Sequence, residues 1–259
     1  MPPLRVGVQL HPQHGAFSDM RRGWLRLEQF GADSVFVSDH LMPLYGDPHG
    51  PHYECWSTLS AIAATTSRVQ LGALVTANSF RNPDLVADMA HTLDHISDGR
   101  AILGIGAGWY ELDYLEYGYE FGTTGTRARA LEHGLERIEA RLAKLSPGPV
   151  RADLPLLIAG TGERIVLRLV AQHADIWNMA ATSPEDFRSK SVALDGWCAE
   201  VGRDPGEIER SVLLNEEAED ARLDEYAEAG ATHIVVWTTG PDWNPWRLER
   251  LIAWRERNT

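Results

Sequence analysis

Cysteine is scarce in this sequence: only Cys55 and Cys198 occur among 259 residues. Two thiols are too few for a disulfide framework or a cysteine zinc site. Long apolar runs are also missing, since no stretch approaches the ~18 apolar residues of a membrane span. Residues 1–10 lack the apolar core of a signal peptide. We therefore expect a cytoplasmic protein that has no membrane partner.

Positive charge is the second scarcity. Lys and Arg number 24 against 37 Asp and Glu, so the net charge is −13. Nucleic acids are recognised by clustered Lys and Arg, and no such cluster is present. We expect a small-molecule substrate and no nucleic-acid partner. Any anionic ligand must be held locally, by a few arginines or by a helix N-terminus.

Short apolar runs alternate with helical stretches along the chain. The runs expected to form strands are residues 5–10, 34–38, 69–76, 101–106, 155–159, 175–179, 209–214 and 232–237. The expected helices are 19–30, 56–66, 83–97, 126–145, 162–173, one from 184, 223–229 and one from 246, with Ser18, Asn82 and Ser183 as N-caps. Eight alternating units predict a (β/α)8 TIM barrel, here one domain over residues 1–259. The alternative is an open doubly wound sheet.

In such a barrel the active site lies at the C-terminal ends of the strands. The pair Asp39-His40 follows the second predicted strand. A histidine titrates near neutrality and suits proton transfer, although it could instead cap a loop. Further polar and aromatic residues near the strand ends are candidates to face the substrate: Gln9, His11, Asn78, Trp177 and Trp237.

Two glycine-rich segments could approach a ligand closely. Gly160, Thr161, Gly162, Glu163 and Arg164 run from a predicted strand into a predicted helix, a pattern that suits a phosphate. Its alternative is a tight turn. The segment Gly106, Ala107 and Gly108, followed by Trp109, could clear room for a flat ring. There the alternative is a packing requirement of the barrel.

Histidine pairs raise the possibility of a metal. His91 and His95 lie four residues apart on a predicted helix, but the glutamate of a zinc-protease motif is missing. We interpret them as a solvated pair. His11 and His14 could bind a metal if other strand ends contributed ligands, which keeps a metal-dependent hydrolase open as an alternative.

An ordered series of motifs resembles a known family. It comprises Ser38-Asp39-His40-Leu41, residues 71–76, Arg81-Asn82-Pro83, residues 93–100, residues 103–109, Tyr117-Gly118 and residues 174–178. Their order is similar to that of the luciferase-like monooxygenases, in the branch that uses the deazaflavin coenzyme F420. The resemblance covers roughly residues 4–215.

This resemblance implies a barrel that binds the cofactor at its strand ends. The family often carries a non-proline cis peptide behind the ring, which aligns near Leu74 and Val75. His40 would transfer or position a proton, with Asp39 orienting it. Gly106, Ala107 and Gly108 would lie along the ring and its ribityl chain, and the turn at residues 160–162 would cradle the phosphate side of the cofactor.

Two departures from the family pattern stand out. The region from Ala143 to Pro155 is short where many members carry an insertion, which predicts an open mouth. Trp109 also occupies the position at which the sugar-phosphate dehydrogenases of the family carry an acid. That difference argues against their activity and leaves Glu111 as a weak candidate for the acid.

The leading hypothesis is therefore an F420-dependent oxidoreductase that acts on an unidentified small molecule. An FMN-dependent monooxygenase is the close alternative, and a catalytically silent cofactor-binding barrel is a third. Trp243, Trp246 and Trp254 near the C-terminus could form the interface of a homo-oligomer.

Overall fold

The computed structural model describes residues 4–151, 153–181, 183–214 and 222–258. Its strands are β1 (Arg5–His11), β2 (Ser34–Val37), β3 (Gln70–Ala73), β4 (Thr76–Ala77), β5 (Ala101–Gly106), β6 (Leu156–Ala159), β7 (Ile176–Ala181), β8 (Glu209–Leu214) and β9 (His233–Thr239). Its helices are α1 (Phe17–Phe30), α2 (Cys55–Thr65), α3 (Pro83–Ile96), α4 (Glu111–Tyr117), α5 (Thr124–Leu142), α6 (Val166–His173), α7 (Pro184–Val201), α8 (Leu223–Glu228) and α9 (Trp246–Asn258), with a 3-10 turn at Pro205–Glu207.

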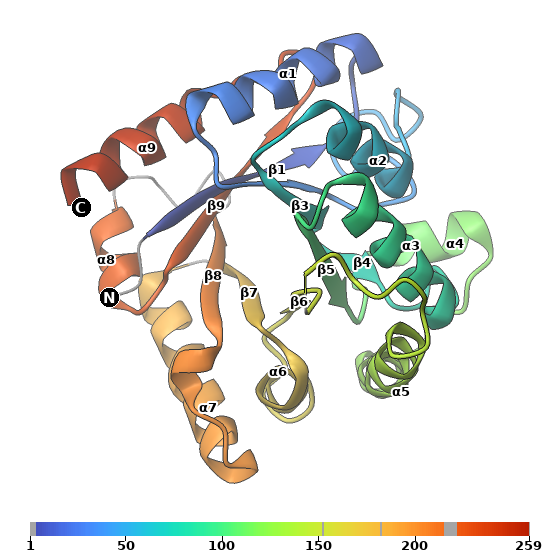
Figure 1. Ribbon diagram of the computed structural model, residues 1–259, viewed down its shortest axis with the longest axis vertical. Coiled ribbons are helices and arrows are strands. Elements are labelled where there is room, and N and C mark those ends of the chain that lie inside the picture. Colours follow the sequence, from blue (N-terminus) through green and yellow to red (C-terminus); the bar gives the residue numbers. More distant parts are fainter. Residues whose placement is uncertain (1–3, 152, 182, 215–221, 259) are drawn as a thin grey trace.

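The strands form one closed parallel sheet. Their order is β3-β2-β1-β9-β8-β7-β6-β5-β4, and a further pairing of β3 with β5 closes the ring. Helices surround the sheet on its outside (Figure 1). This arrangement confirms the predicted (β/α)8 barrel and rules out the open doubly wound sheet.

The third predicted strand is interrupted. Residues 69–76 divide into β3 and β4, and the peptide bond between Leu74 and Val75 separates them in the cis form. The cis peptide therefore lies at the position that the family resemblance implied. Beyond it, Thr76 and Ala77 pair with Ile105 and Gly106, so the strand resumes beside β5.

Strand alternation sorts the core into two layers. An inner cluster fills the barrel and consists of Phe36, Leu74, Ile102, Leu157, Ile176 and Val235. A larger cluster, which includes Val35, Ile105 and Ile158 of the same strands, packs against the surrounding helices. Because successive residues of a strand point to opposite faces, the same parity decides which polar side chains can reach the mouth.

Several predicted boundaries were wrong. The stretch after β5, for which no helix was expected before residue 126, contains α4. Helix α1 begins at Phe17 after Ala16, which provides no side-chain cap, so Ser18 is not its N-cap. Helix α6 begins at Val166 rather than at residue 162. Asn82 and Ser183 do cap their helices, because their side chains accept from the backbone N–H groups of Asp84 and Asp186.

The C-terminal tryptophans do not form one exposed surface. Trp243 is fully buried and Trp254 nearly so, and only Trp246 is substantially exposed. The indole of Trp243 donates a hydrogen bond to the carbonyl oxygen of His11 at 3.2 Å. These side chains therefore attach the C-terminal segment to the barrel, and the expected aromatic interface is not supported.

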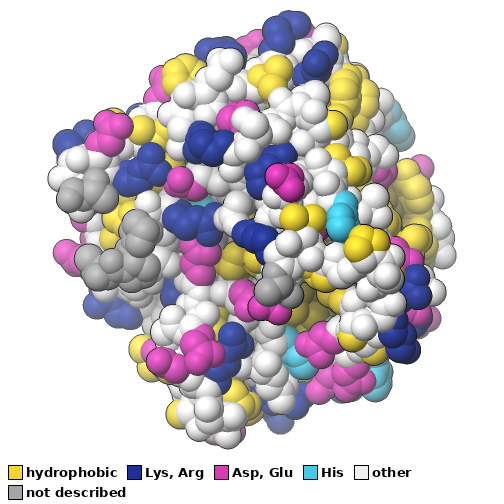
Figure 2. Space-filling view, viewed as in Figure 1, with side chains coloured by type: hydrophobic (Ala, Val, Ile, Leu, Met, Phe, Trp, Pro, Cys, Tyr) yellow, Lys and Arg dark blue, Asp and Glu magenta, His cyan; other side chains and the backbone are white. Residues whose placement is uncertain are grey.

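Charges of both signs are interspersed over the face shown in Figure 2, without a large basic patch on it. In the part of the chain that the structure describes, no helix is both long enough and apolar enough to cross a membrane.

Close strand contacts inside the barrel require glycine at position 104. A Cβ atom there would lie 1.9 Å from the carbonyl oxygen of Ala73. We expect Gly104→Ala to lower the free energy of unfolding by about 3 kcal/mol or more, because a backbone atom cannot move aside easily. Urea denaturation measures the change.

Gly196 provides the matched control, because it lies in α7 and a Cβ atom there would meet nothing within 4 Å. Gly196→Ala should stabilise the protein by about 0.5–1 kcal/mol through the better helix propensity of alanine. Equal effects of the two substitutions would contradict the packing argument.

Candidate active site

The C-terminal end of the barrel brings together side chains from distant parts of the chain. Gln9 and His11 come from β1, His40 follows β2, Trp109 follows β5, and Trp237 comes from β9. Gln9 and His11 are buried, whereas Trp109 is 64% exposed. The residues therefore form a mouth with a buried polar floor and an aromatic rim.

A hydrogen-bonded chain fixes the floor. The side-chain amide of Gln9 donates to the carbonyl oxygen of Leu74, at the cis peptide. Its oxygen consequently faces Nε2 of His11, at 3.0 Å. That ring nitrogen carries the proton, because the facing group is an acceptor. Nδ1 of His11 is buried and has no partner among the described residues, so it offers a lone pair to a donor.

The imidazole of His11 is neutral. Burial, and to a lesser degree the nearby His40 and His52, lowers its pKa to about 3. The ring lies beside Tyr45 and Trp237, at centroid distances of 5.7 and 5.2 Å. Tyr45 and Trp237 also stack on each other, with ring planes 18° apart. An apolar aromatic environment of this kind disfavours a protonated ring.

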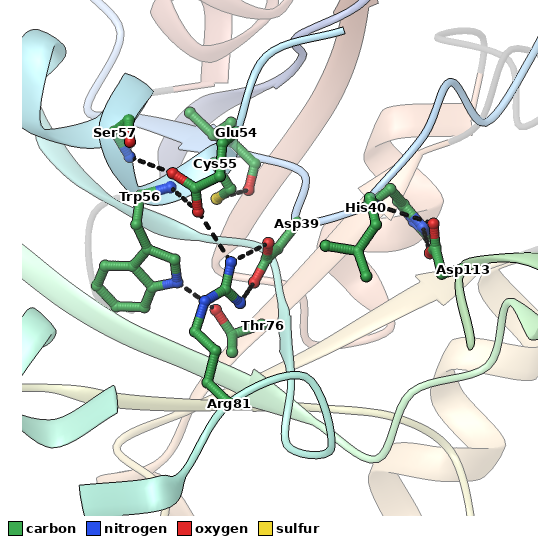
Figure 3. A network of polar contacts seen from close by, with 11 residues as sticks. Asp39, His40, Glu54, Cys55, Trp56, Ser57, Thr76, Arg81 and Asp113 are labelled. Carbon is green, nitrogen blue, oxygen red and sulfur yellow. Dashed lines mark hydrogen bonds and ion pairs between the residues drawn. The ribbon is translucent and has the colours of Figure 1, made fainter. Parts of the chain in front are cut away.

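Asp39 points away from His40. Its carboxylate accepts from Arg81, with Nη1 to Oδ2 at 2.5 Å and Nη2 to Oδ1 at 3.1 Å. Arg81 Nη2 also bonds Glu54, which caps α2 (Figure 3). Burial raises the pKa of Asp39 despite the attraction of Arg81. The prediction that Asp39 orients His40 is therefore wrong: Asp39 attaches the end of β2 to α2 and to Arg81.

The acid that bonds His40 is Asp113. Its Oδ2 lies 2.7 Å from Nδ1 of His40, and its Oδ1 accepts from the backbone N–H of Leu41 at 2.9 Å. The Asp113 side chain is fully buried and comes from α4 (Figure 3). Sequence reasoning missed Asp113 because no helix was expected between residues 97 and 126. An acid on the buried face of a short helix was the available signal.

His40 is fixed on its other sides by aromatic rings. Trp109 and Tyr110 contact it edge to face, at centroid distances of 5.8 and 5.5 Å. Glu111, the weak candidate for an acid, is exposed at the start of α4. The acid–histidine pair of the mouth is therefore buried Asp113 and half-buried His40.

A pocket of about 540 Å³ adjoins His40. One wall is the loop from Leu41 to Glu54, and the other is the end of α4 at Glu116 and Tyr117. The volume is within the range of small-molecule sites. His40 thus lies between the barrel mouth and a cavity that can accept a substrate.

Two residues predicted to face the substrate point elsewhere. Trp177 is fully buried, stacks on Phe187 of α7 at 5.4 Å, and donates to the carbonyl oxygen of Gly160 at 2.9 Å. Asn78 packs on α5, where its side-chain amide donates to the carbonyl oxygen of Ala130 at 3.0 Å. Strand parity turns Trp177 toward the helices, and the carbonyl partner holds Asn78 there.

Glycine is required for different reasons in the two segments, 106–108 and 160–164. A Cβ atom at Gly106 would come within 2.9 Å of Val75, so packing against the cis segment accounts for this glycine. Gly160 has a φ of 141°, which favours glycine. Residues 161–164 are exposed and precede α6 as a turn, so the predicted direct entry into a helix was wrong. Cofactor binding by both segments stays a prediction.

The histidine pairs do not form a metal centre. His91 and His95 of α3 lie against the turn at Pro147 and Gly148. Their Nε2 atoms are hydrogen-bonded to the carbonyl oxygens of Pro147 at 2.7 Å and Gly148 at 3.0 Å. His95 is exposed and His91 is half-buried, so both rings contact solvent, as interpreted, as well as these carbonyl oxygens. Among the described residues, no three His, Cys, Asp or Glu side chains converge to hold a metal ion. The geometry gives no support to the metal-dependent hydrolase.

Comparison with known proteins matches the sequence to a family. The family model described as luciferase-like monooxygenase aligns with residues 2–229. An F420-dependent glucose-6-phosphate dehydrogenase of Kineococcus radiotolerans is 36% identical over 139 residues, 53% of this chain and 40% of that protein. A phthiodiolone/phenolphthiodiolone dimycocerosates ketoreductase of Mycobacterium tuberculosis is 31% identical over 212 residues, 69% of this chain and 55% of that protein.

A solved structure shares the fold. An F420-dependent secondary alcohol dehydrogenase in complex with an F420-acetone adduct superposes with a TM-score of 0.82 at 17% identity. The match covers 98% of both chains. The chain thus spans about half the length of the two named relatives, but it has the whole barrel of this structure.

The buried neutral His11 predicts a loss of stability in acid. Its pKa is about 3 when folded, against 6.5 for an unperturbed histidine. As the pH falls from 6.5 toward 3, the unfolded chain binds a proton that the folded chain does not, so stability decreases. The loss is at most about 1.4 kcal/mol per pH unit for one such group. The slope of the unfolding free energy against pH measures how many more protons the unfolded chain binds than the folded chain. We expect His11→Gln to lower this number by up to about one.

Urea denaturation at a series of pH values measures this slope. His133→Gln is the control, since the side chain of His133 is 81% exposed. An unchanged slope in the His11 variant would show that His11 is not the buried neutral group that the structure indicates.

Proposed function

Because the chain belongs to the luciferase-like monooxygenase family, we propose that it is a coenzyme F420-dependent oxidoreductase acting on a small organic molecule. The named F420-dependent relative, at 36% identity, supports the choice of cofactor. The observation that carries the proposal is the His40–Asp113 pair at the barrel mouth, beside a pocket of substrate size. When bound, the deazaflavin donates or accepts a hydride.

The residues at the mouth fit a flat, hydrogen-bonding ring. His11 Nδ1 is a buried acceptor without a partner among the described residues, and it suits an N–H or O–H group presented there. Leu74 and Val75 would support one face of the ring, with residues 106–109 along its edge. The turn 160–164, which is exposed from Thr161 to Arg164, would hold the anionic side.

His40 moves the proton. Its Nδ1–H donates to the buried Asp113 carboxylate, so Nε2 is the nitrogen available to the substrate. In oxidation of an alcohol, Nε2 takes the hydroxyl proton while the hydride leaves carbon; in reduction of a carbonyl, it returns the proton to oxygen. Asp113 is a positioning residue, because it holds the ring and stabilises its protonated form.

Trp109 stands at the position where the sugar-phosphate dehydrogenases of the family carry an acid, so that acid is missing here. This exposed indole occupies the position after Gly108, and it contacts His40 edge to face. An indole cannot donate an acidic proton to a substrate oxygen at neutral pH. We therefore assign proton transfer to His40 alone and give Trp109 the role of a wall.

Cofactor binding is the first test. Purified protein is titrated with F420 and, separately, with FMN, while intrinsic tryptophan fluorescence is followed. We expect micromolar or tighter binding of F420 and at least about tenfold weaker binding of FMN, a difference of roughly 1.4 kcal/mol. The reverse preference would favour a flavin monooxygenase, and binding of neither would contradict the cofactor assignment.

Substitutions at the pair test the proton path. His40→Ala should lower turnover by about a hundredfold or more, with little change in F420 affinity. Asp113→Asn should lower turnover less and shift the pH profile, because an amide cannot accept from both His40 and Leu41 while also stabilising a protonated ring. Asp153→Asn, an exposed position before β6, is the control. A pH profile that Asp113→Asn leaves unchanged would refute the positioning role.

A further inference from the structure

The pocket beside His40 provides no cation. Its lining consists of His40, Leu41, Met42, Pro43, Pro48, His49, Gly50, His52, Glu54, Glu116 and Tyr117. Neither lysine nor arginine is among these described residues. Sites that bind phosphate or carboxylate normally use arginine, lysine or converging backbone N–H groups. The apolar residues lie on the loop after β2, next to His40.

The arginines near the mouth are already engaged. Arg81 bonds both Asp39 and Glu54, so two carboxylates share one guanidinium. Arg127 donates to the carbonyl oxygen of Gly108 at 3.1 Å, and its guanidinium lies 3.8 Å from the ring centre of Phe121. Reaching an anion in the pocket would require either arginine to give up these contacts.

Buried His11 and half-buried His52, both near the pocket, do not supply positive charge. Burial, followed by the nearby His40, lowers the pKa of His52 to about 4, although Asp113 and Glu54 act in the opposite direction. His11, for which burial likewise dominates, has a pKa of about 3. Both imidazoles are neutral at pH 7, and a neutral imidazole offers a lone pair as well as one N–H donor.

Glu54 and Glu116 add hydrogen-bond acceptors to the pocket. Neither provides an unpaired buried negative charge that would attract a cationic ligand. Burial opposes ionisation of Glu54, but the backbone N–H groups of Ser57 and Trp56 and the Arg81 guanidinium outweigh it and lower its pKa. Arg81 offsets the resulting charge. Glu116 is exposed, and solvent screens it. The pocket as a whole is rich in acceptors, partly apolar, and unfavourable to anions.

We propose that this pocket binds an uncharged alcohol, or the carbonyl compound that corresponds to it, and rejects phosphorylated and carboxylated substrates. This inference rests on the proposed function and specifies its substrate. On oxidation, the O–H proton passes to Nε2 of His40, the carbinol C–H bond breaks as a hydride is transferred to the deazaflavin, and the C=O bond forms. The hydroxyl is a donor, which an acceptor-rich site recognises. A sugar phosphate would meet no lysine or arginine among the described lining residues.

The experiment compares matched ligands on the F420-loaded protein. The pairs are 2-butanol with 3-hydroxybutyrate, and glucose with glucose 6-phosphate, which differ mainly in the anionic group. Dissociation constants come from tryptophan quenching, and turnover from the absorbance of the deazaflavin. We expect the neutral member of a pair to bind at least about tenfold more tightly than the anionic one.

A charge change tests the cause. Glu116→Lys places a cation at the pocket. It should therefore reduce the ratio of the anionic to the neutral dissociation constant about fivefold or more, mainly because the anionic ligand binds more tightly. Glu200→Lys makes the same change on the exposed surface of α7 and should leave the discrimination as it is. Equal or tighter binding of the anionic members, or no saturable binding of any neutral alcohol, overturns the inference. Failure to bind F420 instead overturns the proposed function, and the cofactor titration detects that separately.

Discussion

Closure of the parallel sheet is the constraint on which the site depends. Once β3 pairs with β5, every strand has one face inside the barrel and one against the helices. Gln9 and His11 share the inward parity of β1, so they form the floor of the mouth. Trp177 has the outward parity of β7 and packs against α7. The same closure brings the cis peptide within reach of Gln9.

Asp39 and His40, adjacent at the end of β2, point in different directions and have different partners. Asp39 binds Arg81, and through it Glu54, which connects the strand end to α2. His40 faces the mouth and bonds Asp113 from α4. The two networks share no hydrogen bond among those shown in Figure 3. The strand end is therefore held rigidly by one acid while another acid orients the histidine, an arrangement that suits a preorganised proton-transfer group.

The electrostatics of the mouth differ from those of the whole chain. The protein carries a net charge of −13, yet near the mouth the His11 and His52 imidazoles are uncharged at neutral pH and Arg81 is paired with Asp39 and Glu54. Desolvation is the dominant cause at both His11 and His52. The proposed preference for an uncharged substrate depends on this combination.

The sequence by itself determined the barrel, through eight alternating apolar and helical units, and the family, through an ordered series of motifs. The sequence placed His40 after a strand end, and the family resemblance implied the cis peptide between Leu74 and Val75 that the structure shows. Only the tertiary structure decided which acid serves His40. Neighbours in sequence at a strand end diverge in space, whereas Asp113 lies 73 positions along the chain and reaches His40 through α4. Composition and motif order reflect the local preference of each segment for helix or strand. Contacts between distant elements, such as that of His40 with Asp113, follow from barrel closure and helix packing.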